Sequence, residues 1–252
     1  MIKLSSVIIT FNEERNIRRC LESLAGIADE IIVVDSGSTD NTEAICKSFG
    51  VKFIHNTFDG YAEQKSFATM QCSFDHILSL DADEALSSEL KESINILKDN
   101  WEKDGYSFNR LTNYCGKWIY HCGWYPDRKL RLFKKNNGNW SESKLHERFI
   151  LNNPNNSAML KGDLLHYSYY TIEDHIKQVN KFTEIAAISA FNEGKRSSLV
   201  LILLKPLIRF IRDYFFHLGL LDGYYGFVIC RISSHASFIK YVKLYELQKR
   251  KN

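Results

Sequence analysis

Two aspartates, Asp81 and Asp83, stand two positions apart directly after an apolar run that ends at Leu80. Side chains of an extended chain alternate between its two faces, so residues two apart project to the same side and can approach one cation together. Carboxylate oxygens are ligands that Mg²⁺ prefers, and this ion leaves part of its shell to phosphate oxygens. The pair therefore indicates a divalent metal site that serves a diphosphate. Because Asp pairs are also common on protein surfaces, this interpretation depends on the surrounding pattern.

The pattern around this pair predicts strands that alternate with helices. Four apolar runs rich in β-branched residues predict strands, at Leu4–Thr10, Glu30–Val34, Val51–His55 and His76–Leu80. Helical spacing and cap residues predict the helices between and after them: one that Asn12 caps and that carries Ile17, Leu21 and Leu24, one that Thr39 or Asp40 caps and that ends at Phe49, then Tyr61–Cys72, Ser87–Lys98 and Ile172–Glu193. This alternation predicts an α/β fold, with a doubly wound, mostly parallel sheet flanked by helices.

Polar residues follow three of the predicted strands. They are Thr10–Glu13, Asp35–Asp40 and Asp81–Glu84. Ligands of open α/β sheets bind outside the carboxyl ends of the strands, so we expect these clusters to form one site. The chain has no Gly-x-Gly-x-x-Gly after its first strand and no Gly-Lys-Ser/Thr motif, which argues against a dinucleotide oxidoreductase and a P-loop NTPase.

Composition excludes several other classes of protein. The 252 residues are 44% hydrophobic and 25% charged, which is typical of a globular protein, and the net charge of +3 is too small to indicate nucleic acid as a partner. The six cysteines form no Cys-x-x-Cys pair, and Met1 leads into a strand without an apolar signal region. We therefore expect a cytoplasmic protein with free thiols.

The three polar clusters also carry a family resemblance. Val7–Glu14, Val33–Asp40 and Leu80–Glu84, in this order, resemble the inverting nucleotide-sugar glycosyltransferases of family 2, which have the GT-A fold. A narrower resemblance, nearly to the C-terminus, is to bacterial lipopolysaccharide core enzymes that add β-linked glucose to an inner-core heptose.

The resemblance implies roles for residues in these clusters. It places the nucleoside on the loop of Thr10, Asn12 and Glu13 and on Asp35, with Ser36 beside it and Asp81 near the ribose and the metal. Asp83 matches the direct ligand of Mg²⁺ or Mn²⁺. Ser36 and Asp40 have an alternative as turn and helix-cap residues.

Two further residues outside these clusters are candidates for the diphosphate and the metal. Lys65 could assist the diphosphate, or it could be a solvated charge on its helix. His166 could supply an imidazole to the metal, or it could be a hydrogen-bonded core residue.

An inverting displacement needs a carboxylate that takes the proton from the acceptor hydroxyl. The segment Trp140–Arg148 offers Glu142 and Glu147. In similar enzymes a His-Glu pair stands where this base is expected, which favours Glu147. The alternative is that either glutamate only orders a loop.

The segment Gly123–Phe133 contains candidates for the acceptor site. Aromatic faces stack on sugars and guanidinium groups pair with phosphates, which favours Trp124, Arg128 and Arg131. The alternative is a hydrophobic rim with solvated charges.

The last third of the chain mixes apolar runs with basic residues. Leu199–Leu204 and Phe215–Phe216 flank Lys205, Arg209 and Arg212, and no run approaches the roughly 20 residues that span a bilayer. This segment can lie on an anionic membrane surface, or it can pack as a hairpin or form a homodimer. We expect a catalytic domain over residues 1–170 and a helical extension over residues 171–252.

These observations together predict a metal-dependent inverting transfer of a hexose. The donor expected from the resemblance is UDP-glucose, and the acceptor is a lipopolysaccharide core or a related lipid-linked glycan at the inner face of the membrane. Two alternatives are a sugar-nucleotide nucleotidyltransferase and a nucleotide-binding scaffold. The first would need a Gly-rich basic loop where Thr10–Glu14 is acidic, and intact Asp81, Asp83 and Glu147 argue against the second.

Overall fold

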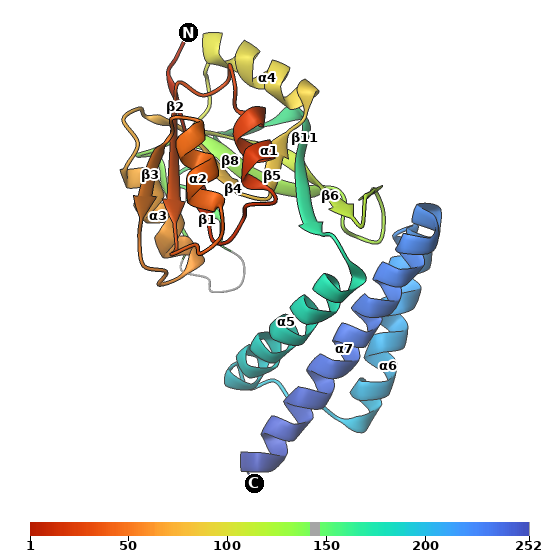
Figure 1. Cartoon of the computed structure of the whole chain (residues 1–252). Coiled ribbons are helices and arrows are strands. Elements are labelled where there is room, and N and C mark those ends of the chain that lie inside the picture. The colour runs from red at the N-terminus through yellow and green to blue at the C-terminus, as the bar shows by residue number, and fades with distance from the viewer. Residues whose placement is uncertain (142–146, 252) are drawn as a thin grey trace. The chain divides into compact units, whose positions relative to one another are not determined.

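The computed structural model describes residues 1–141 and 147–251, which form two compact units. Unit 1 comprises Met1–Arg110 and Asp127–Tyr167, and unit 2 comprises Leu111–Pro126 and Ser168–Asn252. The strands β6 and β11 each begin in unit 1 and end in unit 2 (Figure 1).

The helices and strands of unit 1 follow the predicted alternation and then add further strands. Their bounds are β1 Leu4–Thr10, α1 Ile17–Ser23, β2 Glu30–Asp35, α2 Thr42–Ser48, β3 Lys52–His55, α3 Tyr61–Met70, β4 His76–Asp81, β5 Glu84–Leu86, α4 Ser88–Asp99, β6 Gly105–Tyr114, β8 Asp127–Lys134, β9 Gly138–Trp140, β10 Phe149–Leu151 and β11 Ser157–Tyr169. Within the described residues, the main sheet has the order β3-β2-β1-β4-β8-β6-β11-β5. The first four of these strands are parallel, and β8 begins an antiparallel part.

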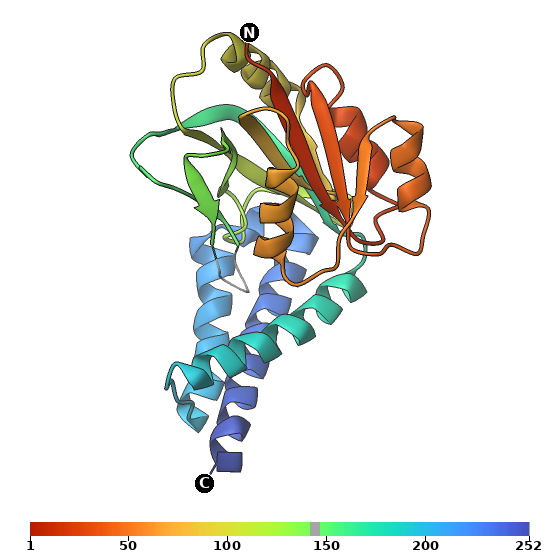
Figure 2. The same ribbon diagram turned by 90° about the vertical axis from the view of Figure 1, so that its left-hand side faces the viewer.

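Helices cover both faces of the parallel strands. Leu4 and Ile8 of β1 pack with α1, α2 and α4 on one face, while Val7, between them in sequence, packs with α3 on the other. This alternation is the period of two that a strand buried on both sides requires. In Figure 2, α3 lies in front of the strands and α1 and α2 lie to one side of them. The expected α/β fold class, a mostly parallel sheet flanked by helices, is confirmed.

Two predicted helix caps are wrong. α1 begins at Ile17 rather than after Asn12, because Asn12 lies in the left-handed region, at φ 53°, and its Oδ1 accepts a hydrogen bond from Thr39 N at 2.8 Å. Asn is one of the few residues that adopt this conformation readily. α2 begins at Thr42 with Asn41 at its N-cap, although the Asp40 carboxylate does accept the Thr42 N–H at 3.0 Å.

The other predicted helices are close to those observed. α3 ends two residues earlier than expected, and α4 has Ser87 as its N-cap, where the Ser87 hydroxyl accepts the Leu90 N–H at 3.2 Å. α5 begins after a capping box in which Thr171 and Asp174 exchange bonds. α4 and α5 therefore begin where the local sequence supplies a partner for unpaired N–H groups, whereas α3 begins after Gly60 without a side-chain cap.

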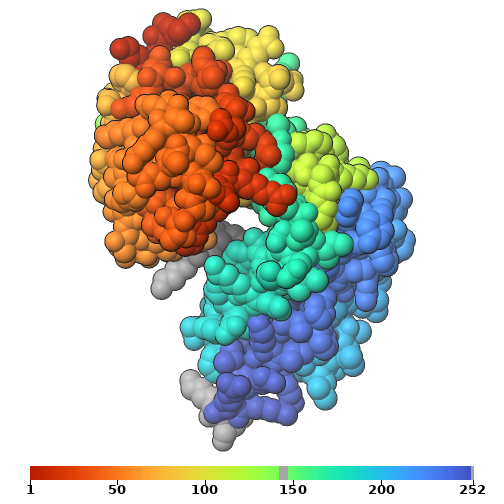
Figure 3. Space-filling view, viewed as in Figure 1, coloured from red at the N-terminus to blue at the C-terminus, as the bar shows by residue number. Residues whose placement is uncertain are grey.

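Unit 2 is mostly helical. Its elements are the strand β7 Lys117–Ile119, the long helices α5 Ile172–Asn192, α6 Leu199–Ile211 and α7 Gly223–Lys251, and the short turns Arg212–Phe216 and Gly219–Asp222. α7 packs against both α5 and α6. In the space-filling view, α5 (teal) and α7 (blue) lie side by side (Figure 3). None of the described helices is both long enough and apolar enough to cross a membrane.

Candidate active site

The carboxyl ends of β1, β2 and β4 bring the predicted polar clusters to one edge of the sheet. Thr10 pairs with Asp35 across the β1–β2 ladder, and Ile9 pairs with Asp81 across the β1–β4 ladder. The expectation that the three clusters share an edge is therefore confirmed, and its cause is the parallel order of these strands.

Side chains of the first two clusters bond the loops to each other. Asn12 N donates to Ser38 Oγ at 2.8 Å, Glu13 N donates to Thr42 Oγ1 at 2.8 Å, and Glu14 N donates to Asp40 Oδ2 at 3.0 Å. Asp40 thus bonds the start of α2 and the neighbouring loop at once. These bonds match the turn alternative that the sequence offered for Asp40, although the N-cap position of α2 belongs to Asn41.

Asp35 is fully buried beneath its turn. Its carboxylate accepts the backbone N–H groups of Gly37 at 2.9 Å and Ser38 at 2.8 Å, and His55 Nδ1 lies 3.3 Å from it. The neighbouring Ser36 hydroxyl accepts Gln64 Nε2 at 3.1 Å. Both residues therefore shape the loop at the predicted nucleoside position, and direct contact with a base stays a prediction.

Thr10 and Glu13 give this loop two further polar groups. The buried Thr10 Oγ1 has no hydrogen-bond partner within residues 1–141 and 147–251, so it can accept or donate to a ligand. Burial raises the pKa of Glu13 to about 7. The hydrogen bond from Asn16 lowers this pKa, and the carboxylates of Asp83, Asp40 and Asp81 raise it further. The nearby carboxylates thus disfavour a further negative charge on Glu13 and favour a cation beside it.

Asp81 lies between two buried cations. Lys65 Nζ is 2.8 Å from Asp81 Oδ1, and Nη2 of the Arg131 guanidinium group is 2.7 Å from Asp81 Oδ2. Burial alone would raise the pKa of Asp81, but Arg131 and Lys65 outweigh it and hold the pKa well below its usual range. Lys65 is 0% exposed and Arg131 is 4% exposed, so the alternatives that made them solvated charges are wrong. Charged groups this deeply buried require partners, and both cations share Asp81.

The sequence interpretation missed the partners of this network. The Glu84 carboxylate is buried and accepts the Asp81 N–H at 2.9 Å. It also lies 3.4 Å from a guanidinium nitrogen of Arg131 and 3.4 Å from one of Arg110. Arg110 also lies 2.9 Å from Asp127. Glu84 directly follows the aspartate pair, but its arginine partners come from β6 and β8, so no local signal could identify them.

Asp83 and His166 lie next to each other although they are 83 positions apart in the chain. The antiparallel pairing of β5 with β11 sets His166 opposite Glu84, and His166 Nε2 is 3.3 Å from Asp83 Oδ2. The His166 side chain is 14% exposed and that of Asp83 is 22% exposed. The structure thus brings together the two predicted metal ligands, and both keep access to solvent.

The donor set fits a metal that a substrate helps to bind. Asp83 supplies hard oxygen ligands and His166 an imidazole, which together suit Mn²⁺ or Mg²⁺. In the part of the chain that the structure describes, no group of three His, Cys, Asp or Glu side chains has the arrangement of a metal site. Since Asp81 pairs with Lys65 and Arg131, Asp83 and His166 are the two candidate ligands that this edge offers among residues 1–141 and 147–251, and oxygens of a bound substrate would complete the shell.

Glu147 reaches this edge from the segment after β9. Its Oε1 lies 2.9 Å from Lys65 Nζ, and its side chain is 19% exposed. Glu142, the other candidate base, lies outside the described residues. Lys65 therefore connects the predicted base to the first aspartate of the metal motif.

The three acceptor candidates have different surroundings. Arg128 is exposed on β8, whereas Arg131 on the same strand faces the buried network. Trp124 belongs to unit 2, where its ring packs 5.8 Å from that of Tyr114 and 5.5 Å from that of Tyr169. Acceptor contacts by these residues stay predictions.

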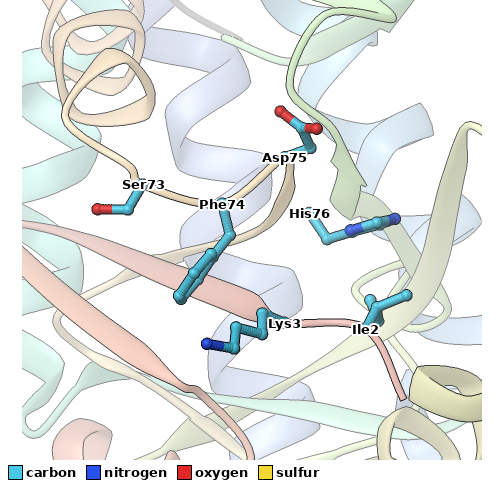
Figure 4. A pocket seen from close by; sticks show the side chains of 6 residues that line it. All are labelled: Ile2, Lys3, Ser73, Phe74, Asp75 and His76. Atoms are coloured by element: carbon cyan, nitrogen blue, oxygen red, sulfur yellow. The ribbon is translucent and has the colours of Figure 1, made fainter.

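A shallow depression lies at the opposite end of the same strands. Its lining residues come from the chain before β1 and from the turn that leads into β4 (Figure 4): Ile2, Lys3, Ser73, Phe74, Asp75 and His76. The amino ends of parallel strands lack the convergent loops that build ligand sites in such sheets. The candidate site is therefore the edge with Asp83.

Sequence comparison identifies the protein family to which this chain is similar. The model of glycosyl transferase family 2 matches residues 5–192. An uncharacterized glycosyltransferase of Rickettsia typhi is 32% identical over 98% of this chain and 88% of its own. The lipopolysaccharide core biosynthesis glycosyltransferase LpsC of Rhizobium meliloti is 32% identical over 97% of this chain and 93% of its own.

Solved structures similar to this chain include two proteins described with UDP. S. aureus TarS in complex with UDP aligns with a TM-score of 0.49 and 15% identity, over 100% of this chain and 92% of that one. Glucosyl-3-phosphoglycerate synthase from Mycobacterium tuberculosis, in complex with Mn²⁺, UDP and glucosyl-3-phosphoglycerate, aligns over 44% of each chain, with a TM-score of 0.36 and 22% identity. The family match over most of the chain and the relatives that align almost end to end agree with the sheet and its acidic edge: the chain belongs to glycosyl transferase family 2.

Proposed function

We propose that this glycosyltransferase moves glucose from UDP-glucose, with inversion, to a lipopolysaccharide core or a related lipid-linked glycan. The observation that carries the metal-dependent mechanism is the pair of Asp83 and His166 at the carboxyl edge of the sheet, with Glu147 held there by Lys65. The name of the relative LpsC supports the acceptor class. Residues 1–170 are proposed as the catalytic domain and residues 171–252 as a helical extension.

The donor is proposed to bind across the loops that follow β1, β2 and β4. Thr10, Asn12 and Glu13 bind the nucleoside together with the turn that Asp35 and Ser36 order, and Asp81 contributes near the ribose. Asp83 and His166 would hold Mg²⁺ or Mn²⁺ with oxygens of the diphosphate. The bound cation supplies positive charge that stabilises the diphosphate as it leaves.

The chemistry proposed for Glu147 is that of a general base. Its carboxylate takes the proton from the acceptor hydroxyl while the hydroxyl oxygen forms a bond to the anomeric carbon. The bond between that carbon and the diphosphate oxygen breaks, and its electron pair leaves with UDP. Attack opposite to the leaving group inverts the anomeric configuration. Arg128, exposed on β8, is proposed to contact phosphates of the acceptor.

The donor assignment has a direct test. We expect the protein with Mn²⁺ to release nucleoside diphosphate faster from UDP-glucose than from UDP-galactose, GDP-mannose or UDP-N-acetylglucosamine. The acceptor is lipopolysaccharide truncated at its inner-core heptoses, and product is followed by mass spectrometry. A preference for another sugar would overturn the donor assignment but not the family, whereas release of pyrophosphate from a sugar phosphate and UTP would indicate nucleotidyl transfer.

Unit 2 supports a location at an anionic membrane surface. The exposed apolar residues of α6 and of the turn after it are here called the α6 apolar face: Leu199, Val200, Leu203, Leu204, Leu207, Ile208, Ile211, Phe215 and Phe216. A helix with such a face and basic neighbours binds in the plane of the bilayer interface. A cytoplasmic enzyme with a lipid-linked acceptor must meet that acceptor at the inner membrane face.

Two of the basic residues beside this face are paired with a carboxylate, which the sequence did not predict. Arg209 and Arg212 pair with Asp213, which is 1% exposed, but their side chains remain 43% and 47% exposed. Two guanidinium groups against one carboxylate, with exposed Lys205, leave the region positive. Removing both arginines would leave the buried Asp213 with only His217, 3.3 Å away, among the ion-pair partners that the described residues give it. A test should therefore change the apolar residues instead.

We expect the wild-type protein to co-sediment with vesicles that contain phosphatidylglycerol and to be released by high salt, since each basic residue near such a surface contributes about 1 kcal/mol. Leu203→Ser with Phe216→Ser should weaken this binding because both side chains, 71% and 76% exposed, would no longer enter the interface. The matched control is Met70→Ser with Ile96→Ser, two exposed apolar residues of unit 1. Equal losses in both double variants, or no binding by the wild type, would contradict membrane docking and favour a packing or homodimer surface.

A further inference from the structure

Lys65 contacts two carboxylates from distant parts of the chain. Its Nζ lies 2.8 Å from Asp81 Oδ1 and 2.9 Å from Glu147 Oε1, and the side chain has no exposed surface. An ammonium group removed from water is tolerated only with close partners of opposite charge. The position of Lys65 therefore depends on both carboxylates, and their positions depend on Lys65.

The two carboxylates do not depend on Lys65 equally. Asp81 also pairs with Arg131, which in turn lies near Glu84, so Asp81 keeps a cation if Lys65 is removed. For Glu147, Lys65 is the ion-pair partner that the structure gives within residues 1–141 and 147–251. Loss of the ammonium would thus leave Asp81 paired with Arg131, whereas Glu147 would lose its ion pair and keep only a longer-range attraction to Arg131.

A second contact ties the same segment to the same helix. Trp140 Nε1 donates to Thr69 Oγ1 at 3.1 Å, and the Trp140 ring lies 5.3 Å from Lys65 Nζ. Lys65 and Thr69 are one helical turn apart, and the Thr69 hydroxyl donates to Lys65 O at 2.7 Å. The helix α3 therefore anchors the chain before residue 142 through Trp140 and after residue 146 through Glu147.

We propose that Lys65 is a positioning residue that holds the Glu147 carboxylate at the metal-site edge, rather than a ligand of the donor diphosphate. This inference rests on the proposed function, since it takes Glu147 as the base. A direct diphosphate contact would require the Nζ to leave two ion pairs and a fully buried position. Acting through Glu147 requires no such movement.

The test separates placement of the base from donor binding. Lys65→Met keeps the length of the side chain and removes its charge. We expect kcat for transfer to truncated lipopolysaccharide to fall roughly 10- to 100-fold, since misplacing a catalytic group by about an ångström costs up to about 10² in rate. The Kd of UDP with Mn²⁺, measured by calorimetry, should stay within about threefold of wild type, because rate and affinity report different contacts.

Lys98→Met is the matched control. Lys98 is also buried and pairs with Asp29 at 2.8 Å, but it lies at the end of α4 that contacts the loop before β2. The Lys98→Met variant should lose about as much free energy of unfolding as Lys65→Met, and its kcat should equal that of the wild type. An equal loss of kcat in Lys98→Met would assign the effect of Lys65 to general destabilisation and overturn the proposal.

The double variant Lys65→Met with Glu147→Gln completes the test. If Lys65 acts through Glu147, its substitution should change kcat less than threefold in the Glu147→Gln background, because coupled residues are not additive. Additive losses, or a UDP Kd raised more than tenfold in Lys65→Met, would overturn the proposal and favour diphosphate contact. If Glu147→Gln alone has no effect, the base assignment fails instead. Should Lys65→Met not fold, Lys65→Arg is used in the same cycle, since its planar group keeps the charge but changes the geometry.

Discussion

Replacing Asp83 by Asn is expected to abolish sugar transfer while leaving the fold intact. The amide keeps the shape of the side chain but removes the charge that, with His166, is proposed to hold the cation beside the diphosphate. Metal stabilisation of a leaving group contributes several kcal/mol, which corresponds to a loss of roughly a thousandfold or more in kcat. The measurement is the rate of UDP release with truncated lipopolysaccharide and Mn²⁺.

Asp75→Asn is the matched control for this variant. Asp75 is an exposed aspartate at the amino end of the same strand, β4, in the depression of Figure 4. Its substitution should leave transfer within about twofold of wild type, as expected for surface changes away from a site. Wild-type rates in Asp83→Asn, or in the wild type with excess chelator, would contradict a metal mechanism.

The dependence of Mn²⁺ affinity on UDP is a second test of the metal site. With two protein ligands, the protein alone should bind Mn²⁺ weakly, and UDP should tighten the binding because its phosphate oxygens complete the shell. Calorimetry of Mn²⁺ with and without UDP measures the difference. Equally tight binding in both titrations would mean that the protein supplies ligands beyond Asp83 and His166.

Replacing Glu147 by Gln is expected to lower kcat by roughly 10²–10⁴-fold, which is the usual contribution of a general base. Gln keeps the size of the side chain and can still accept a hydrogen bond from Lys65, so the site should stay ordered. The Kd of UDP with Mn²⁺ should stay within about threefold, since the base acts on the acceptor and not on the nucleotide.

Glu142→Gln is the comparison variant for this prediction. Lys65 and Asp81 give Glu147 a defined place beside the metal motif, and we therefore expect a much smaller loss for Glu142→Gln. If the two effects were reversed, Glu142 would be the base, and the assignment of the family and the metal site would stand.

The sequence alone determined the framework of the site. Apolar runs rich in β-branched residues and helical segments between them predicted the existence and order of β1 to β4 and α1 to α4, although α1 and α2 begin later than expected. A parallel sheet then requires the polar residues after these strands to meet at one edge. The aspartate pair, the acidic loop after β1 and the Asp35 turn could all be assigned to that edge without coordinates.

Only the tertiary structure decided how the charges pair. Lys65 and Glu147 lie 82 positions apart, Asp81 and Arg131 lie 50 apart, and His166 reaches Asp83 through the pairing of β5 with β11. Side-chain types at these positions were compatible with a solvated lysine, an exposed arginine or a core histidine. Burial of a charge is set by which segments pack over it, and this depends on contacts between residues far apart in the chain. The sequence therefore identified the acidic residues of the site, while the fold decided their partners: Asp81 pairs with Lys65 and Arg131, Glu84 is buried beside Arg131 and Arg110, and Asp83 lies beside His166.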